Sequence, residues 1–291
     1  MQSMQLEIRN LKVNYGNFTA LSGVTLTLQS GGLTGLVGSN GAGKSTLIKT
    51  IATLLRPASG QILLDGTDIC RNPNAIRRVL GYLPQDVPVY PNLSAWEYLA
   101  FLASVKGIDG ESSRKQIKSL MKTLHLSDVG KKPLSQFSGG MRQRVGIIGA
   151  LLGNPKIIIA DEPTVGLDPQ ERAAVRNLLT QLAADKIVLL STHIVSDVEA
   201  AASNLILLKD GKVLFYGSPE KLAEHAEGHV WQCTFPDLTR IPQGFAVSSA
   251  VQGKSGINVK IVGAQPPVDR SAPASPTLED ACLYAMRGES V

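Results

Sequence analysis

The chain has 291 residues and a formal net charge of +5, and 43% of its residues are hydrophobic against 18% charged. These values describe an ordinary globular chain, long enough for one large domain or for a main domain with an appendage. Lys and Arg never stand more than two together in the sequence. This scatter argues against a dedicated nucleic-acid surface, so no direct nucleic-acid partner is expected.

The first thirty residues alternate between apolar and polar side chains, beginning with Leu6 and Ile8. A period of two predicts half-buried strands in an antiparallel arrangement. An apolar strand is expected over 33–37 and a helix over 46–55, with a glycine-rich segment between them.

Helical patterns fill a block of the chain over about residues 86–150. The tetrapeptides at 94–97 and 113–116 have the spacing of capping boxes, so each predicts the start of a helix. A third helix is expected to begin near Gly140.

Continuous apolar, β-branched runs at 156–160 and 187–190 predict central parallel strands that are covered by helices on both faces. The segment 204–215 has Asp210-Gly211 between two apolar runs, which predicts a hairpin with a type I′ turn. Together these patterns predict an α/β fold with an antiparallel β subdomain at its N-terminus.

The composition changes near Gly228. Short β-like segments precede a stretch with four prolines, 264–277, and a last helix is expected at 278–286. We therefore expect a main domain over 1–227 and a small α+β appendage over 228–291, with the Pro-rich stretch as a linker. The expected short strands are 230–235, 245–251 and 257–262.

Three cysteines lie far apart, without a C-x-x-C pair, which favours a reduced, cytosolic protein over a disulfide scaffold or a zinc site. The N-terminus lacks the apolar segment of a signal peptide, and no apolar run approaches the ~20 residues of a membrane helix. A cytoplasmic chain is expected, and a transport role would need a separate membrane subunit.

Residues 38–46 read GSNGAGKST, which matches G-x-x-x-x-G-K-[ST] between an expected strand and an expected helix. Glycines let several backbone N–H groups point at phosphate oxygens, and the helix N-terminus adds partial positive charge. Lys44 is predicted to reach the β- and γ-phosphates, and the Ser45 hydroxyl is predicted to bind Mg²⁺. The predicted phosphate-site residues are Gly38, Ser39, Asn40, Gly41, Ala42, Gly43, Lys44, Ser45 and Thr46.

Asp161 and Glu162 follow the apolar run 156–160. Ligand sites in open α/β sheets lie at this carboxyl edge of the strands. Asp161 is predicted to bind Mg²⁺, directly or through water, and Glu162 to polarise the attacking water. Taken alone, two such carboxylates also suit the cap of a following helix.

The segment Phe137-Ser138-Gly139-Gly140-Met141 resembles the signature motif of ABC-type ATPases. With the signature included, the family's motifs stand in the family's order: Tyr15, the phosphate loop, Gln85, the signature, Asp161-Glu162, Asp168 and His193. The chain is identified as a member of this family. Its residues at 82–85, 164–169 and 276–280 are similar to those of ATPase subunits of bacterial exporters.

The resemblance implies a head-to-tail homodimer with two ATP molecules, each held between one phosphate loop and the partner's signature. Ser138, Gly139 and Gly140 would contact the γ-phosphate from across the interface. Met141 stands where the family more often has Gln. The Met side chain lacks the hydrogen-bonding capacity of Gln at that edge, and the effect of Met141 on the signature stays open.

The resemblance also implies roles for single residues outside the phosphate loop. Tyr15 would stack on adenine, Gln85 would touch Mg²⁺ and the water, His193 would contact the γ-phosphate, and Asp168 would link the two sites. The residues alone leave ordinary structural roles open for Tyr15, Gln85 and His193.

The segment 86–96 is aromatic and apolar enough to line a groove for a helix of a separate transmembrane permease subunit. Ordinary packing of the helical block explains Tyr90, Leu93 and Trp96 equally well. The resemblance favours export over import, at the inner face of the cell membrane. The alternative is a soluble, non-transport ABC ATPase that acts on a macromolecular assembly.

Overall fold

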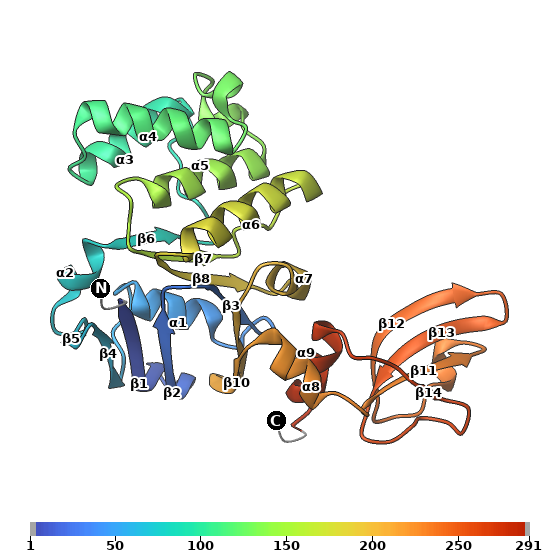
Figure 1. The fold of residues 1–291 in the computed structure, drawn as a ribbon. Helices are drawn as coiled ribbons and strands as arrows, with labels where there is room; N and C mark the ends of the chain where they lie inside the picture. Colours follow the sequence, from blue (N-terminus) through green and yellow to red (C-terminus); the bar gives the residue numbers. More distant parts are fainter. Residues whose placement is uncertain (1–3, 289–291) are drawn as a thin grey trace.

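A six-stranded sheet forms the centre of the computed structural model, which describes residues 4–288 (Figure 1). Its order is β10-β9-β3-β8-β7-β6, with all neighbours parallel except the last strand, β10. The strands are β3 (Leu33–Val37), β6 (Leu80–Leu83), β7 (Ile157–Asp161), β8 (Ile187–Thr192), β9 (Asn204–Lys209) and β10 (Lys212–Gly217).

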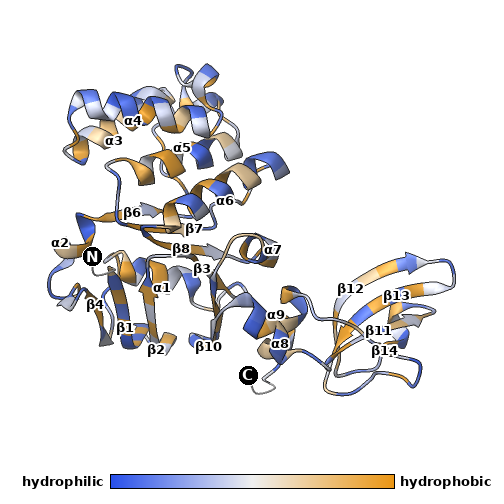
Figure 2. Ribbon diagram, viewed as in Figure 1, coloured by the Kyte–Doolittle hydropathy of each residue, from blue (hydrophilic) through white to orange (hydrophobic). Residues whose placement is uncertain are grey.

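The predicted central strands are confirmed, because β7 and β8 are parallel to each other and buried at every residue. Figure 2 shows the hydrophobic residues concentrated along these strands, as expected where helices cover both faces. The predicted hairpin is also confirmed. Asp210 and Gly211 have φ values of 49° and 74°, which suit a type I′ turn between β9 and β10.

A second sheet, of order β2-β1-β4-β5, confirms the predicted antiparallel N-terminus. Its strands are β1 (Gln5–Tyr15), β2 (Phe18–Gln29), β4 (Ser59–Leu64) and β5 (Thr67–Asp68). Helix α1 (Lys44–Ile51) lies between this sheet and the central one (Figure 1), and Leu47 and Ile48 share a buried cluster with both. The expected helix 46–55 is therefore shorter than predicted, because Thr53 has φ 60° and cannot continue it.

The helices from the middle of the chain are α2 (Pro73–Arg77), α3 (Ala95–Val105), α4 (Gly110–Thr123), α5 (Gly139–Leu151), α6 (Pro169–Ala183) and α7 (Val195–Glu199), with 3-10 turns at Ser127–Val129 and Leu134–Gln136. Helices α5 and α6 cover the face of the central sheet opposite α1, with α3 and α4 packed on α5, whereas Ile76 of α2 lies in the buried cluster on the α1 side (Figure 1). The predicted helix near Gly140 is confirmed as α5.

Of the two predicted capping boxes, one is confirmed and one is wrong. Ser94 and Glu97 cap α3 reciprocally, with the Ser94 N–H donating to the Glu97 carboxylate at 2.8 Å. Helix α4, however, begins one turn before Ser113. The Asp109 carboxylate accepts from the N–H of Ser112 at 2.9 Å, so the first-turn donors are already satisfied when the chain reaches Ser113.

The last part of the chain forms a third sheet, of order β12-β13-β11-β14, at the far end of the molecule from α2 and β5 (Figure 1). The three predicted strands are confirmed, and a short fourth strand pairs inside the Pro-rich stretch. The elements are α8 (Pro219–His225), β11 (Val230–Phe235), a 3-10 turn (Leu238–Arg240), β12 (Ala246–Gly253), β13 (Gly256–Val262), β14 (Ala272–Pro273) and α9 (Leu278–Met286).

Helix α9 leads the chain back to the main body. Leu278 and Cys282 share a buried cluster with Leu222 of α8 and Val198 of α7. The ring of His229 stacks on Tyr284 with 4.5 Å between ring centroids. The chain therefore enters the third sheet from α8 and leaves it through α9, and both helices pack together at the main body. Within residues 4–288, no helix has the length and apolar character needed to cross a membrane.

Candidate active site

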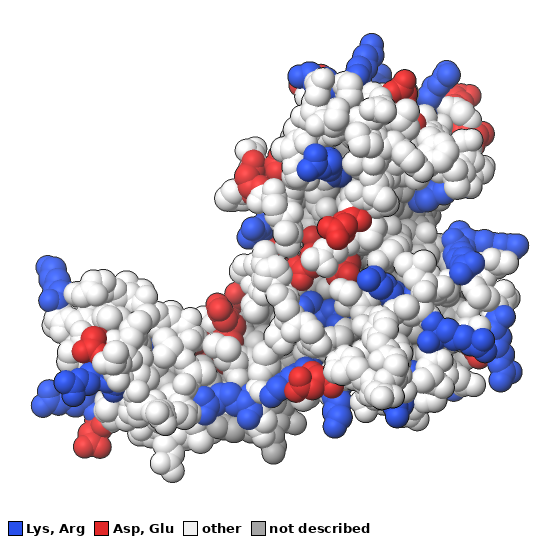
Figure 3. All heavy atoms as spheres, turned by 180° about the vertical axis from the view of Figure 1, so that it is seen from behind, with Lys and Arg blue, Asp and Glu red and all other residues white. Residues whose placement is uncertain are grey.

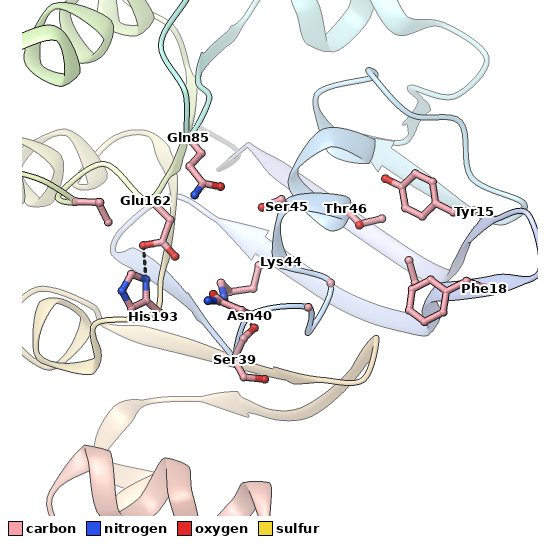
Figure 4. Close-up of a pocket in the computed structure, with 14 residues that line it drawn as sticks. Tyr15, Phe18, Ser39, Asn40, Lys44, Ser45, Thr46, Gln85, Glu162 and His193 are labelled. Carbon is pink, nitrogen blue, oxygen red and sulfur yellow. Dashed lines mark hydrogen bonds and ion pairs between the residues drawn. The ribbon is translucent and has the colours of Figure 1, made fainter. Parts of the chain in front are cut away.

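A cavity of about 480 Å³ opens at the carboxyl ends of the central strands (Figure 4). It gathers residues from the β1–β2 hairpin, the phosphate loop, the end of β6, the end of β7 and the end of β8. Its lining residues are Tyr15, Phe18, Ala20, Ser39, Asn40, Gly41, Gly43, Lys44, Ser45, Thr46, Gln85, Glu162, Val165 and His193. Sequence motifs more than 170 residues apart therefore meet in one cavity.

The phosphate loop needs its glycines for steric reasons. A Cβ at Gly38 would lie 2.4 Å from the carbonyl oxygen of Leu208. Gly43, which precedes α1, has φ 105°, and its Cβ would meet the carbonyl of Ala20 at 2.8 Å. The loop is thus packed against β2 and β9, and its backbone can surround a ligand only with glycine at these positions.

Lys44 folds over the loop from the first turn of α1. Its Nζ donates to the carbonyls of Gly38 at 2.6 Å and Ser39 at 3.2 Å. Burial lowers the pKa of the Lys44 ammonium, and the charges of Glu162 and Asp161 act in the opposite direction. A cation in this position has a direct path to an anion in the cavity.

Asp161 ends β7, and its side chain is almost fully buried. Among the described residues, its Oδ1 atom is buried and has no hydrogen-bond partner. Such an orphaned carboxylate oxygen is what a cation or its bound water would satisfy. The Ser45 hydroxyl and the Gln85 amide, both lining the cavity, add the oxygen ligands that Mg²⁺ prefers, so the residues fit this ion.

Glu162 has φ 53°, a left-handed conformation that is strained for a residue other than glycine. Its N–H donates to Ser191 at 3.0 Å, and its carbonyl accepts from Gln143 at 3.2 Å. These bonds hold the strained backbone and direct the side chain into the cavity. Its Oε2 lies 3.0 Å from Nδ1 of the half-exposed His193 (Figure 4).

Two exposed aromatic rings stand at the mouth of the cavity. Tyr15 is 48% exposed and Phe18 is 64% exposed, and they face each other as a register pair across the β1–β2 turn (Figure 4). Sequence reasoning named Tyr15 and missed Phe18. The signal was present, since two aromatic residues flank the two-residue turn Gly16-Asn17.

The signature residues do not line the cavity of their own chain. Ser138 and Gly139 are exposed at the start of α5, where Ser138 caps the helix by accepting from Met141 at 3.2 Å. Gly140 is buried, and a Cβ there would lie 2.9 Å from the carbonyl of Gly166. Asp168, also exposed, caps α6 instead.

Buried ion pairs connect the signature helix to the segment that follows Glu162. Arg144 of α5 pairs with Glu171, which completes the capping box of α6. The fully buried Asp197 accepts from Thr164 at 2.6 Å and from Arg176 at 2.8 Å. Helix α5 is therefore linked to α6, and both α6 and the segment at Thr164 are linked to α7.

The comparisons with known proteins agree with this geometry. The family described as ABC transporter matches residues 21–165. The chain is 34% identical over 224 residues to the probable sulfate/thiosulfate import ATP-binding protein CysA of Chlorella vulgaris, covering 76% of this chain and 94% of that protein. It is 34% identical over 223 residues to the lantibiotic transport ATP-binding protein SrtF of Streptococcus pyogenes, covering 75% and 94%.

Other relatives are longer. The chain is 33% identical over 252 residues to ABC transporter A family member 8 of Dictyostelium discoideum, covering 83% of this chain and only 30% of that protein. It also spans only 42% of the length of YbhF, a probable multidrug ABC transporter ATP-binding protein of Escherichia coli.

Solved structures show the same fold. An ATP-binding subunit of an ABC transporter superposes with a TM-score of 0.70 at 32% identity, covering 76% of this chain and 92% of that chain. A dimer of the ATP-binding cassette MJ0796 in a post-hydrolysis state, bound to ADP and Pi, superposes with a TM-score of 0.67 at 29% identity, covering 73% and 98%. The chain belongs to the ABC transporter family and is an ATPase of its ATP-binding cassette type.

Proposed function

We propose that this chain is the ATP-hydrolysing subunit of an ABC transporter, working as a head-to-tail homodimer that drives a separate membrane subunit. One observation carries the proposal. The cavity collects Lys44, Gln85, Glu162 and His193, while the exposed Ser138 and Gly139 lie outside it. A second copy of the chain would supply the signature residues that the cavity lacks.

Within one chain, the residues divide the work on the nucleotide. The Tyr15 and Phe18 rings would receive adenine, and the loop N–H groups with Lys44 would bind the phosphates. Glu162 would accept a proton from the attacking water, and His193, 3.0 Å from its Oε2, would orient that carboxylate. Mg²⁺, held by Ser45, Asp161 and Gln85, would neutralise charge on the phosphates.

The partner chain would complete the site. Ser138 and the N–H groups of Gly139 and Gly140 stand at the N-terminus of a 13-residue helix, which favours an anion such as the γ-phosphate. Asp168 would then lie between the two ATP sites. Arg144 and Glu171 join α5 to α6. When the two chains close on one ATP, this ion pair would transmit the movement of α5 to Asp168 at the start of α6, and so to the other site.

A groove formed by the segment that follows Gln85 in the chain and by α3 supports a membrane partner. Tyr90, Leu93 and Phe101 line a cavity of about 430 Å³, and the Tyr90 and Phe101 rings are 58% and 46% exposed. Trp96, which the sequence placed in the same groove, lines a different cavity in the helical block. An exposed aromatic groove of this size suits a helix of a transmembrane permease subunit.

The relatives include one protein named for import and one named for lantibiotic transport, so their names do not decide the direction of transport. The short sequence segments that resemble exporter subunits favour an exporter. The chain would sit at the cytoplasmic face of the membrane, held there by the permease. Residues 1–227 would form the ATPase domain, and residues 228–291 an appendage with its own sheet.

The test is to isolate the tagged Glu162→Gln chain with ATP from gently solubilised membranes and to identify the proteins that accompany it by mass. A stoichiometric partner with several membrane spans is the expected result. The tagged Lys44→Ala chain is the control for ATP-dependent complexes. If the tagged chain is instead recovered with ribosomal or assembly proteins and with no membrane protein, the transporter proposal is overturned. That result would favour a non-transport ATPase.

A further inference from the structure

A second cavity, of about 600 Å³, lies at the end of α1 that points away from the phosphate loop. It is formed by the segment that follows α1 and by the segment between β5 and α2. Its lining includes Thr50, Thr53, Leu54, Arg56 and Arg71. None of its residues lines the ATP cavity, so it is a separate feature of the fold.

Two exposed cations, Arg56 and Arg71, line this cavity, and the exposed Arg77 contacts its wall at Thr53. Lys49 and Arg78, also exposed, are chain neighbours of Thr50 and Arg77, and we call these five cations the basic edge. The stretch from Lys49 to Arg78 contains only two acids, Asp65 and Asp68. Figure 3 shows Lys and Arg side chains gathered along the side of the molecule that carries α2, β4 and β5. Arg56 and Arg71 are fifteen residues apart in the sequence, and the fold brings them to one cavity.

Most of this charge is uncompensated. The Asp68 carboxylate lies 3.5 Å from the guanidinium of the exposed Arg71, which makes a long ion pair. Within residues 4–288, Lys49, Arg56 and Arg78 form no ion pair. Cations that are neither paired nor buried are available to an external anion.

The cavity wall is also unusually constrained. Thr53 has φ 60°, which is strained for a β-branched residue. Arg77 holds this conformation by donating to the Thr53 hydroxyl at 2.8 Å and to its carbonyl at 3.3 Å. The neighbouring Leu54 is 59% exposed and lines the same cavity as Arg56 and Arg71.

We infer that the basic edge binds the phosphate-bearing headgroups of anionic phospholipids, with Leu54 entering the boundary between headgroups and acyl chains. This inference rests on the proposed function, because a subunit held at a membrane meets such a surface. Guanidinium groups make paired hydrogen bonds to phosphate, and an apolar side chain among cations suits the membrane interface. The third sheet lies at the opposite end of the molecule and leaves the edge uncovered (Figure 1).

The experiment is flotation of the purified full chain with vesicles of phosphatidylglycerol and phosphatidylcholine, compared with vesicles of phosphatidylcholine alone. The variant carries Arg56→Gln, Arg71→Gln and Arg78→Gln, and Arg77 is kept because it supports Thr53. Its affinity for the anionic vesicles should fall on the order of 100-fold, since each cation near such a surface contributes about a factor of five. Its ATP turnover should not change.

A matched control removes the same charge elsewhere. Arg114→Gln, Lys118→Gln and Lys122→Gln act on three exposed cations of α4, and this variant should bind the vesicles like the unaltered chain. Leu54→Ser should weaken vesicle binding about tenfold through the lost apolar contact. An equal loss of vesicle affinity in the α4 control would mean that binding depends only on the net charge of the chain. That result would overturn the basic edge as a binding site.

Two further outcomes would also overturn the inference. One is equal binding of the unaltered chain to neutral and anionic vesicles. The other is binding of inorganic phosphate at the basic edge without any vesicle binding, which would assign the site to a soluble anion. Because the purified chain is used alone, neither outcome affects the isolation test for a membrane subunit, so the two proposals fail separately.

Discussion

Replacing Glu162 by Gln should lower ATP turnover by about 10²- to 10⁴-fold, while ATP affinity stays within about twofold. The amide has nearly the shape of the carboxylate but cannot accept the proton of the attacking water. The strained backbone of Glu162 is held through its own N–H and carbonyl by Ser191 and Gln143, and the substitution leaves both bonds in place. Steady-state phosphate release and equilibrium ATP titration measure the two quantities.

The matched control is Glu224→Gln, which removes an exposed glutamate from α8, remote from the cavity lining. It should turn over ATP at the unaltered rate. Undiminished hydrolysis by the Glu162→Gln chain would show that another group activates the water, and the nearest candidate would be His193 itself.

Replacing Lys44 by Ala should weaken ATP binding by at least about 100-fold, because hydrogen bonds to charged groups contribute roughly 1.5–3 kcal/mol each and two phosphates lose their contact. The fold should persist. The ammonium is buried at a desolvation cost, which is why burial lowers its pKa, and its hydrogen-bond partners among residues 4–288 are two loop carbonyls. Calorimetric titration with ATP measures the loss.

Lys49→Ala is the control for this substitution, since Lys49 is an exposed lysine on the same helix that does not line the ATP cavity. It should bind ATP normally. ATP affinity within threefold of the unaltered value for Lys44→Ala would contradict the placement of the phosphates over the loop.

The sequence predicted the central strands and the phosphate loop because their physical requirements are local. Strand β7 is a run of apolar residues that suits only a doubly covered strand, and Gly38 and Gly43 stand where any side chain would collide with neighbouring backbone. Short-range patterns of this kind leave few structural alternatives.

Local patterns failed where two signals competed. The box at 113–116 looked like a helix start, but Asp109 caps α4 one turn earlier by accepting from the N–H groups of Glu111 and Ser112. The Pro-rich stretch gave no strand signal, yet Ala272 and Pro273 pair with β11 at the sheet edge, where a missing N–H is tolerated.

Features made by the fold as a whole were out of reach of the sequence. Phe18 lines the cavity only because the β1–β2 hairpin packs against the phosphate loop. The basic edge exists because the β4–β5 hairpin and α2 return Arg71 and Arg77 to the end of α1. Tertiary contacts, which a single sequence does not display, decided both.

The central claim is that two copies of the chain close on ATP through the signature. Light scattering of the Glu162→Gln chain with Mg-ATP measures this directly, and the expected mass is twice the 30.9 kDa of one chain. Adding Ser138→Arg, which places a bulky side chain on an exposed signature position, should restore the single-chain mass while ATP still binds. A single-chain mass for Glu162→Gln at saturating ATP, or a dimer that tolerates Ser138→Arg, would contradict the claim.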